Sequence, residues 1–137
     1  MIVYRLAASA YKDDLSGMGA KIYGGRWNSV GFPALYCTQN ISLAVLEILV
    51  RTGIDILPPD YFILKLDIPD KLTVQKILKS KLKSDWKIDV ELTQWMGTSF
   101  LKNAKHAIME VPSAIVDDEY NFLLNPVLSR FFLQISD

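Results

Sequence analysis

The chain has little of what disulfides, metal centres and thiol or histidine chemistry require. Its 137 residues include one cysteine, Cys37, and one histidine, His106. An internal disulfide is therefore excluded, and two ligands so far apart in the sequence do not make a metal site. We expect Cys37 to be a small buried residue at the end of a strand, in a protein that is kept in a reducing cytoplasm.

The chain also lacks an excess of charge of either sign, since 15 basic and 15 acidic side chains give a formal net charge of zero. Without the basic footprint of a nucleic-acid binder, no direct nucleic-acid partner is expected. No apolar run approaches the roughly 20 residues that cross a bilayer, and no secretion signal opens the chain, so no membrane partner is expected. Half of the residues are hydrophobic, which predicts apolar surface that another subunit or a partner protein covers.

The hydrophobic pattern predicts a single domain over residues 1–137, of the α+β class, with mixed or antiparallel sheets and flanking helices. Strands are expected over residues 2–6, 32–37, 61–68, 107–111 and 130–135. Helices are expected over 41–50, capped by Asn40 or Ser42, and over about 89–103, with Leu92, Trp95, Met96 and Phe100 inward. The remaining segments are predicted to be a glycine-rich functional loop (11–31), a solvated basic face (71–84) and a turn-rich apolar stretch (121–126).

Glu47 is the one ionisable side chain within the apolar run Ile41–Val50. A helix that is apolar on every side is expected in a core, and Leu43, Leu46 and Val50 share the stripe of Glu47. A carboxylate in such a place is costly unless a cation or a hydrogen-bond donor meets it. Two interpretations stay open, namely a structural ion pair with an arginine and a catalytic acid that lines a pocket.

The second unusual cluster is Gly24-Gly25-Arg26-Trp27-Asn28. The two glycines let a ligand approach the backbone closely, and an arginine after them can fork onto phosphate oxygens. Trp27 offers a stacking surface or a core anchor, and Asn28 offers both donors and acceptors. Because the spacing fits neither a Walker loop nor a dinucleotide fingerprint, the cluster indicates an anion pocket, with a tight turn and a surface arginine as the alternative.

Ser113 follows Val111-Pro112 at the end of an expected strand, where the proline restricts the backbone that carries the hydroxyl. No Gly-x-Ser-x-Gly elbow surrounds it, so it is a better candidate for hydrogen bonding than for nucleophilic attack. A guanidinium, a phenol, an acid and a hydroxyl are thus available from Arg26, Tyr36, Glu47 and Ser113. Such a set suits a nucleotide with a pyrophosphate and a ribose, and it lacks the metal ligands typical of phosphoryl transfer.

Several ordered motifs resemble the RES domain family, which is named for an arginine, a glutamate and a serine. They are the 24–28 cluster, Gly31, Leu35-Tyr36, Leu43-Ala44-Val45-Leu46-Glu47, Val111-Pro112-Ser113-Ala114 and the segment from Glu119 to Pro126. By motif, the family's arginine, tyrosine, glutamate and serine fall on Arg26, Tyr36, Glu47 and Ser113, and a further arginine falls on Arg5. Histidines common in the family are replaced here by Arg51 and, after Pro126, by Val127-Leu128.

The resemblance implies a fold like that of the ADP-ribosyltransferases and a bacterial toxin of an Xre–RES toxin–antitoxin module. NAD would be its substrate rather than a prosthetic group, and the nicotinamide–ribose bond would be cleaved by hydrolysis or phosphorolysis. Mono-ADP-ribosylation of a protein target is the alternative reaction. The residues expected to bind NAD are Arg5, Gly25, Arg26, Trp27, Asn28 and Asn121. The implied partner is an Xre-type antitoxin that blocks the pocket, and a homodimer is compatible with the resemblance.

Two other classes of function compete with this interpretation. A non-catalytic interaction protein would keep a vestigial pocket, with Glu47 merely paired to an arginine, and the intact set of four side chains counts against it. A nucleic-acid-cleaving toxin conflicts with the neutral net charge and with the missing base or metal constellation.

Overall fold

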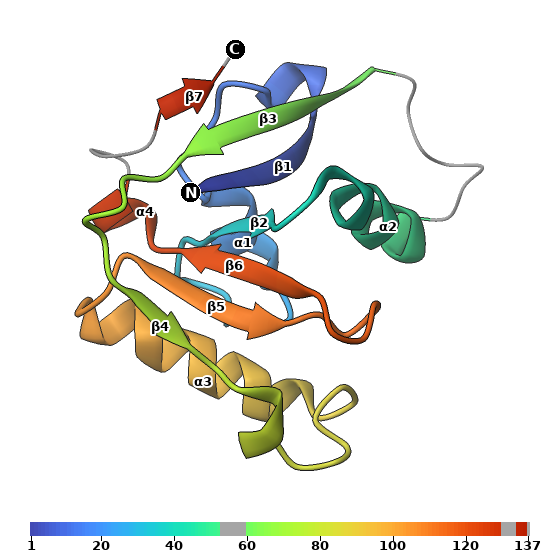
Figure 1. The fold of residues 1–137 in the computed structure, drawn as a ribbon, viewed down its shortest axis with the longest axis vertical. Coiled ribbons are helices and arrows are strands. Elements are labelled where there is room, and N and C mark those ends of the chain that lie inside the picture. The colour runs from blue at the N-terminus through green and yellow to red at the C-terminus, as the bar shows by residue number, and fades with distance from the viewer. Residues whose placement is uncertain (53–59, 130–133, 137) are drawn as a thin grey trace.

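One mixed β-sheet organises the computed structural model, which describes residues 1–52, 60–129 and 134–136 (Figure 1). Its seven strands lie in the order β4-β5-β6-β2-β1-β3-β7. β4 and β5 run parallel, and the other neighbouring strands of this sheet are antiparallel. The predicted α+β class is therefore confirmed.

The elements follow one another without regular alternation. The strands are β1 (Ile2–Ala8), β2 (Leu35–Thr38), β3 (Tyr61–Asp67), β4 (Val74–Lys76), β5 (Ile108–Pro112), β6 (Tyr120–Leu124) and β7 (Gln134–Ser136). The helices are α1 (Met18–Tyr23), α2 (Ile41–Thr52), α3 (Val90–Asn103) and α4 (Pro126–Ser129). In Figure 1, α3 runs beside β4 and β5, while α2 lies near β1 and β2 at the other half of the molecule.

Both faces of the central strands are covered, so the protein has two core clusters. Neighbouring side chains of a strand point to opposite faces, and in β6 Phe122 belongs to one cluster while Leu123 belongs to the other. The first cluster combines side chains of β1, β2, β3, β5 and β6, and the second contains Trp27 and Trp86 together with Phe100 of α3. The sheet thus separates two cores, one on each of its faces.

The segment 121–126 was predicted to be turn-rich, and this prediction is wrong, because most of it forms the central strand β6. The run Phe122-Leu123-Leu124 is continuously apolar, as expected of a strand that is buried on both faces. In its register with β2, Tyr36 stands opposite Leu123, and Thr38 stands opposite Asn121. Residues directly opposite each other share one face of a sheet, so this register decides which polar side chains meet.

Two further predictions differ from the structure, and a third is only partly covered by it. The glycine-rich segment 11–31 contains the short helix α1, and the basic segment 71–84 contains β4. β4 is only three residues long and sits at the sheet edge, so it leaves little signal in the sequence. The start of the strand predicted over 130–135 lies outside the described residues, and its end falls on β7.

Helix α2 begins as predicted, since Asn40 Oδ1 accepts a hydrogen bond from Leu43 N at 2.7 Å and so caps the first turn. The prediction that it is buried on every side is wrong. It buries Leu43 and Ile48, whereas Val50 is 66% exposed and Leu46 also faces outward. The helix therefore packs against β1 and β2 with one face and presents an apolar face to its surroundings.

Helix α3 confirms part of the predicted inward face, since Phe100 is buried and Met96 packs against the core. Trp95 was also expected inside, but it is 68% exposed, while Thr93, Gly97 and Thr98 are buried. The small side chains face inward because the helix packs against the backbone of the 25–29 loop. A Cβ atom on Gly97 would lie 1.6 Å from the carbonyl oxygen of Trp27, so only glycine permits this approach.

We predict that Gly97→Ala lowers the free energy of unfolding by about 2–3 kcal/mol, because overpacking at the loop outweighs the roughly 1 kcal/mol that alanine gains in a helix. Gly19→Ala is the matched control, since nothing lies within 4 Å of a Cβ at that position of α1. It should stabilise the protein by about 0.5–1 kcal/mol. Chemical denaturation of both variants measures the difference, and a Gly97→Ala protein as stable as the parent would contradict the packing argument.

Candidate active site

A cavity of about 730 Å³ lies between β1, β2, α2 and the glycine-rich segment, within the usual size range of small-molecule sites. It brings together most of the residues that the sequence singled out: Arg5, Gly25, Arg26, Trp27, Tyr36, Glu47 and Asn121. Ser113 and Asn28 are not among the lining residues. The acid and the two guanidiniums, far apart in the sequence, therefore border one common space.

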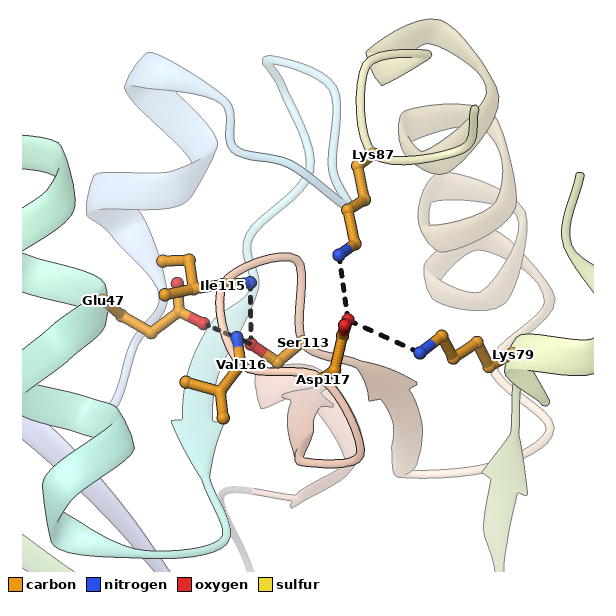
Figure 2. Close-up of polar contacts among 7 residues, drawn as sticks. All are labelled: Glu47, Lys79, Lys87, Ser113, Ile115, Val116 and Asp117. Carbon is orange, nitrogen blue, oxygen red and sulfur yellow. Dashed lines mark hydrogen bonds and ion pairs between the residues drawn. The ribbon is translucent and has the colours of Figure 1, made fainter. Parts of the chain in front are cut away.

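Glu47 projects from α2 and is held by two uncharged donors. Ser113 Oγ donates to its Oε1 at 3.3 Å (Figure 2), and Asn121 Nδ2 donates to the same oxygen at 2.7 Å. No basic group among the described residues forms an ion pair with Glu47, so the structural ion pair considered above is not found. Both bonds go to Oε1, which leaves Oε2 of a half-buried carboxylate available to a ligand.

Ser113 uses all of its hydrogen-bonding capacity within the protein. Its Oγ accepts from the amides of Ile115 at 3.0 Å and Val116 at 3.1 Å, and it donates to Glu47 (Figure 2). A hydroxyl has one proton and two lone pairs, so none is left for a substrate. The predicted contact between Ser113 and the substrate is therefore replaced by a supporting role, in which the buried hydroxyl orients Glu47.

Asn121 reaches the cavity from β6, opposite Thr38 in the sheet register. While its Nδ2 holds Glu47, its Oδ1 is a buried atom without a hydrogen-bond partner in the described part of the protein. Buried polar atoms are normally satisfied, so an acceptor next to the cavity is a place where a ligand hydroxyl or amide can bond.

The loop that carries Arg26 is held by a hydrogen-bond network in which Tyr36 and Asn28 are central. Tyr36 Oη accepts from Trp27 N at 3.0 Å and donates to Asn28 Oδ1 at 2.6 Å. Asn28 Nδ2 donates to carbonyl oxygens of Ala20, Ser29 and Phe32. Because Asn28 is fully buried and bonded on both ends, the structure gives it a structural role in place of the predicted contact with NAD.

Trp27 is a core anchor rather than a stacking surface. Its side chain is buried, and its ring centroid lies 6.1 Å from that of Trp86. Gly25 takes part through its lack of a side chain, because a Cβ there would lie 2.6 Å from Tyr36 Oη. Of the 24–28 cluster, the side chain that remains for a ligand is that of Arg26.

Arg26 lines the cavity and is half-buried. Its Nη1 donates to the carbonyl oxygen of Lys87 at 2.7 Å, which aims the guanidinium while most of its five N–H donors remain for an anion. The backbone beneath it is fixed by α3, since Thr93 Oγ1 donates to the carbonyl of Arg26 at 2.6 Å and Gln94 Nε2 donates to that of Gly25 at 2.9 Å.

Arg5 comes from β1, and its Nη1 donates to the carbonyl oxygen of Tyr36 at 3.3 Å. Asp14 also lines the cavity. Hydrogen bonds from Ser16, and to a smaller extent the positive charge of Arg5, keep the pKa of Asp14 below its usual value. Complete burial raises the pKa of the neighbouring Cys37 thiol to about 12, although Arg5 opposes this shift. Cys37 is thus buried, as predicted, and its raised pKa keeps the thiol protonated.

The sequence reasoning missed several residues of the cavity and its support. Tyr4, Asp14 and Ile115 line the space, and Lys87 holds Arg26 through a backbone carbonyl. Asp14 lies in the glycine-rich segment that was expected to be functional, which is a usable signal. A carbonyl contact leaves no signal, because every residue type carries the same carbonyl group.

Among the residues that the structure covers, no group of three or more His, Cys, Asp or Glu side chains could hold a metal ion. Likewise, none of the described helices is long and apolar enough to pass through a bilayer.

The fold and cavity define an α+β domain in which a carboxylate, Glu47, and two guanidiniums, Arg5 and Arg26, border one cavity. The RES domain family model matches residues 2–136, and this chain therefore belongs to the RES domain family. The "Toxin Res" of Photorhabdus laumondii is 42% identical over 139 residues, which cover 99% of this chain and 88% of that protein. The "Prs ADP-ribosylating toxin" of a Sphingobium species is 34% identical over 118 residues, or 83% of this chain and 73% of that protein.

A solved structure shows the same fold. The crystal structure of the M. tuberculosis MbcT–MbcA toxin–antitoxin complex contains a chain that matches with a TM-score of 0.79. The match covers 99% of this chain and 81% of that chain at 22% sequence identity. The two chains thus share their arrangement of strands and helices, although most of their aligned residues differ.

We predict that Tyr36→Phe destabilises the protein by about 1–3 kcal/mol, because it leaves the Trp27 amide and Asn28 Oδ1 without their partner. Tyr11→Phe, at a side chain that is 64% exposed, should stay within about 0.5 kcal/mol of the parent. Urea unfolding measures both. An unchanged stability of Tyr36→Phe would mean that the network does not hold the loop.

Proposed function

We propose that this RES-domain toxin acts on NAD in the cytoplasm and cleaves the bond between nicotinamide and ribose. The proposal rests above all on one observation, that Glu47 borders the same cavity as Arg5 and Arg26 and is held there by neutral donors. A carboxylate that has no cationic partner among the residues the structure describes is suited to meet positive charge that develops on a substrate.

Departure of nicotinamide leaves a ribose with oxocarbenium character, as in glycoside hydrolysis. Glu47 Oε2 would face that sugar, bind its hydroxyls and stabilise the developing charge, which is usually the largest single catalytic contribution. Ser113 and Asn121 fix the other carboxylate oxygen, so little reorganisation is needed at the moment of reaction. In this proposal Glu47 is the catalytic residue and Ser113 is a positioning residue.

The pyrophosphate of NAD would be bound by the two arginines. A guanidinium matches phosphate oxygens in a bidentate manner, and Arg26 is already aimed by the Lys87 carbonyl. Tyr36 also lines the cavity, and its ring would pack against nicotinamide or ribose. Asn121 Oδ1, buried and without a partner among the described residues, would accept a hydrogen bond from a ribose hydroxyl or the carboxamide.

Water or phosphate as the attacking group would make the protein an NAD glycohydrolase or phosphorylase. The second candidate is transfer of ADP-ribose to a protein, and the Sphingobium relative, a "Prs ADP-ribosylating toxin", is the observation that favours it. Both reactions release nicotinamide, whereas labelled ADP-ribose stays on protein only in the second. Incubation with NAD labelled in the adenosine portion therefore separates the two.

The proposed partner is an antitoxin of the Xre type. The similar fold of MbcT was solved in complex with the antitoxin MbcA, and here the apolar side of α2 offers surface next to the cavity. Val50 both lines the cavity and is 66% exposed, so a partner packed on α2 could close the entrance. Expression alone should then arrest growth, and co-expression of the antitoxin should restore it.

We predict that Glu47→Gln lowers the rate of nicotinamide release about a hundredfold, since removing one such electrostatic contact costs roughly 3 kcal/mol of barrier. Glutamine keeps the shape and can still accept the bonds from Ser113 and Asn121, so the unfolding midpoint should change little. Glu91→Gln, on the exposed surface of α3, is the control and should retain full activity. A folded Glu47→Gln protein with parental turnover would refute the role of Glu47.

We predict that Arg26→Ala raises KM for NAD about tenfold or more, because a charge-assisted hydrogen bond to a phosphate is worth about 1.5–3 kcal/mol. Arg26→Lys should recover only part of the affinity, since an ammonium lacks the planar fork. Lys105→Ala, at an exposed lysine outside the cavity, should leave KM unchanged. Steady-state kinetics decide the matter, and an unaltered KM in Arg26→Ala would remove the phosphate-binding role.

A further inference from the structure

The loop 113–118, which leads away from β5, is held from outside by a small ion-pair network (Figure 2). Asp117 Oδ1 lies 3.0 Å from Lys87 Nζ and 3.4 Å from Lys79 Nζ. A hydrogen bond from Lys87 and the charges of both lysines hold the pKa of Asp117 below its usual value. Asp117 is exposed and does not line the cavity, so it has no direct contact with a ligand there.

The inner side of the same loop orients the Ser113 hydroxyl. The amides of Ile115 and Val116 both donate to Ser113 Oγ, and that hydroxyl donates to Glu47 (Figure 2). Val116 directly precedes Asp117 in the chain. Because the two lysines fix the position of Asp117, they also restrict the position of the Val116 amide. That amide in turn orients the Ser113 hydroxyl toward Glu47.

Lys87 has a second contact that leads to the opposite wall of the cavity. Its side chain pairs with Asp117, while its backbone carbonyl accepts the hydrogen bond from Arg26 Nη1 at 2.7 Å. One residue thus holds both the loop that orients Glu47 and the guanidinium of Arg26. A continuous path of contacts runs from the acid to the arginine around the outside of the cavity.

We propose that Asp117 is a positioning residue of the active site, which through Lys87 fixes the loop that orients Glu47 relative to the segment that holds Arg26. This inference deepens the proposed function and rests on it. A single exposed ion pair contributes little to stability, so the effect of Asp117 lies in geometry, where a misplacement of about 1 Å can cost on the order of a hundredfold in rate.

The test compares Asp117→Asn with Asp118→Asn. The two changes remove the same charge from adjacent exposed positions, but Asp118 forms no ion pair within the described structure. Asp118 also has a φ of +67°, a conformation that asparagine tolerates well. We expect Asp117→Asn to lose about tenfold in kcat/KM for NAD. A displaced Glu47 should lower kcat, and a displaced Arg26 should raise KM. Asp118→Asn should match the parent, and Asp117→Glu should recover part of the loss.

Two further measurements keep the inference separate from a general loss of stability. Lys87→Met retains the backbone carbonyl and should reproduce most of the loss, and adding it to Asp117→Asn should cost little more, because both remove one interaction. At 1 M salt the Debye length is only about 3 Å, so the exposed ion pair is screened. The kcat/KM of the parent should then fall toward that of Asp117→Asn. Fully additive losses from Lys87→Met and Asp117→Asn would overturn the link through Lys87.

Amide hydrogen exchange gives a readout that does not depend on turnover. Asp117→Asn should lose protection at Ile115 and Val116, whereas Asp118→Asn should not. Unchanged protection and unchanged kcat/KM in Asp117→Asn would overturn the positioning role. If the parent protein itself releases no nicotinamide, the proposed function fails, and the exchange data still decide whether Asp117 holds the loop.

Discussion

The candidate site depends on two hydrogen bonds that meet at one oxygen of Glu47. They come from Ser113 and Asn121, on the loop after β5 and on β6, and they fix the carboxylate without neutralising it. An arginine in the same place would have fixed it equally well and would have compensated its charge. Neutral donors therefore preserve the electrostatic effect of the acid toward a ligand, and this is the property that an oxocarbenium-like transition state requires.

The opposite wall of the cavity depends on close approach of backbones. Gly97 lets α3 pack onto the carbonyl of Trp27, and Gly25 leaves room for the Tyr36 hydroxyl. Around these contacts, the polar atoms of the 25–29 loop are bonded to α3 and to Tyr36. The loop backbone is consequently held at several points, and Arg26 is the member whose charged group lines the cavity. The cluster of five residues thus divides into one side chain that is left for a ligand and four residues that hold it in place.

Sequence reasoning predicted much of this site by residue type. Five of the predicted residues border the cavity, namely Arg5, Arg26, Tyr36, Glu47 and Asn121. The family match also confirms the resemblance of the chain to the RES domain family. Sequence reasoning could not show which polar side chains satisfy one another. Asn28 was expected to bind NAD and Ser113 to form hydrogen bonds at the site, and in the structure the donors and acceptors of both are bonded within the protein. A sequence lists hydrogen-bonding groups without showing which of them are already paired.

The hydrophobic pattern by itself determined the α+β class, the longer strands apart from the central β6, and both long helices, because periodicity and chain-breaking residues act over a few positions along the chain. Only the tertiary structure decided which face of each helix is buried. Trp95 is outside and Gly97 inside, since a backbone from a distant segment packs there, and α2 keeps an apolar face outward. The same applies to Asp117 and Lys87, which are 30 residues apart. Their contact exists only because the folded sheet brings the two loops together, and local sequence carries no record of such a long-range neighbour.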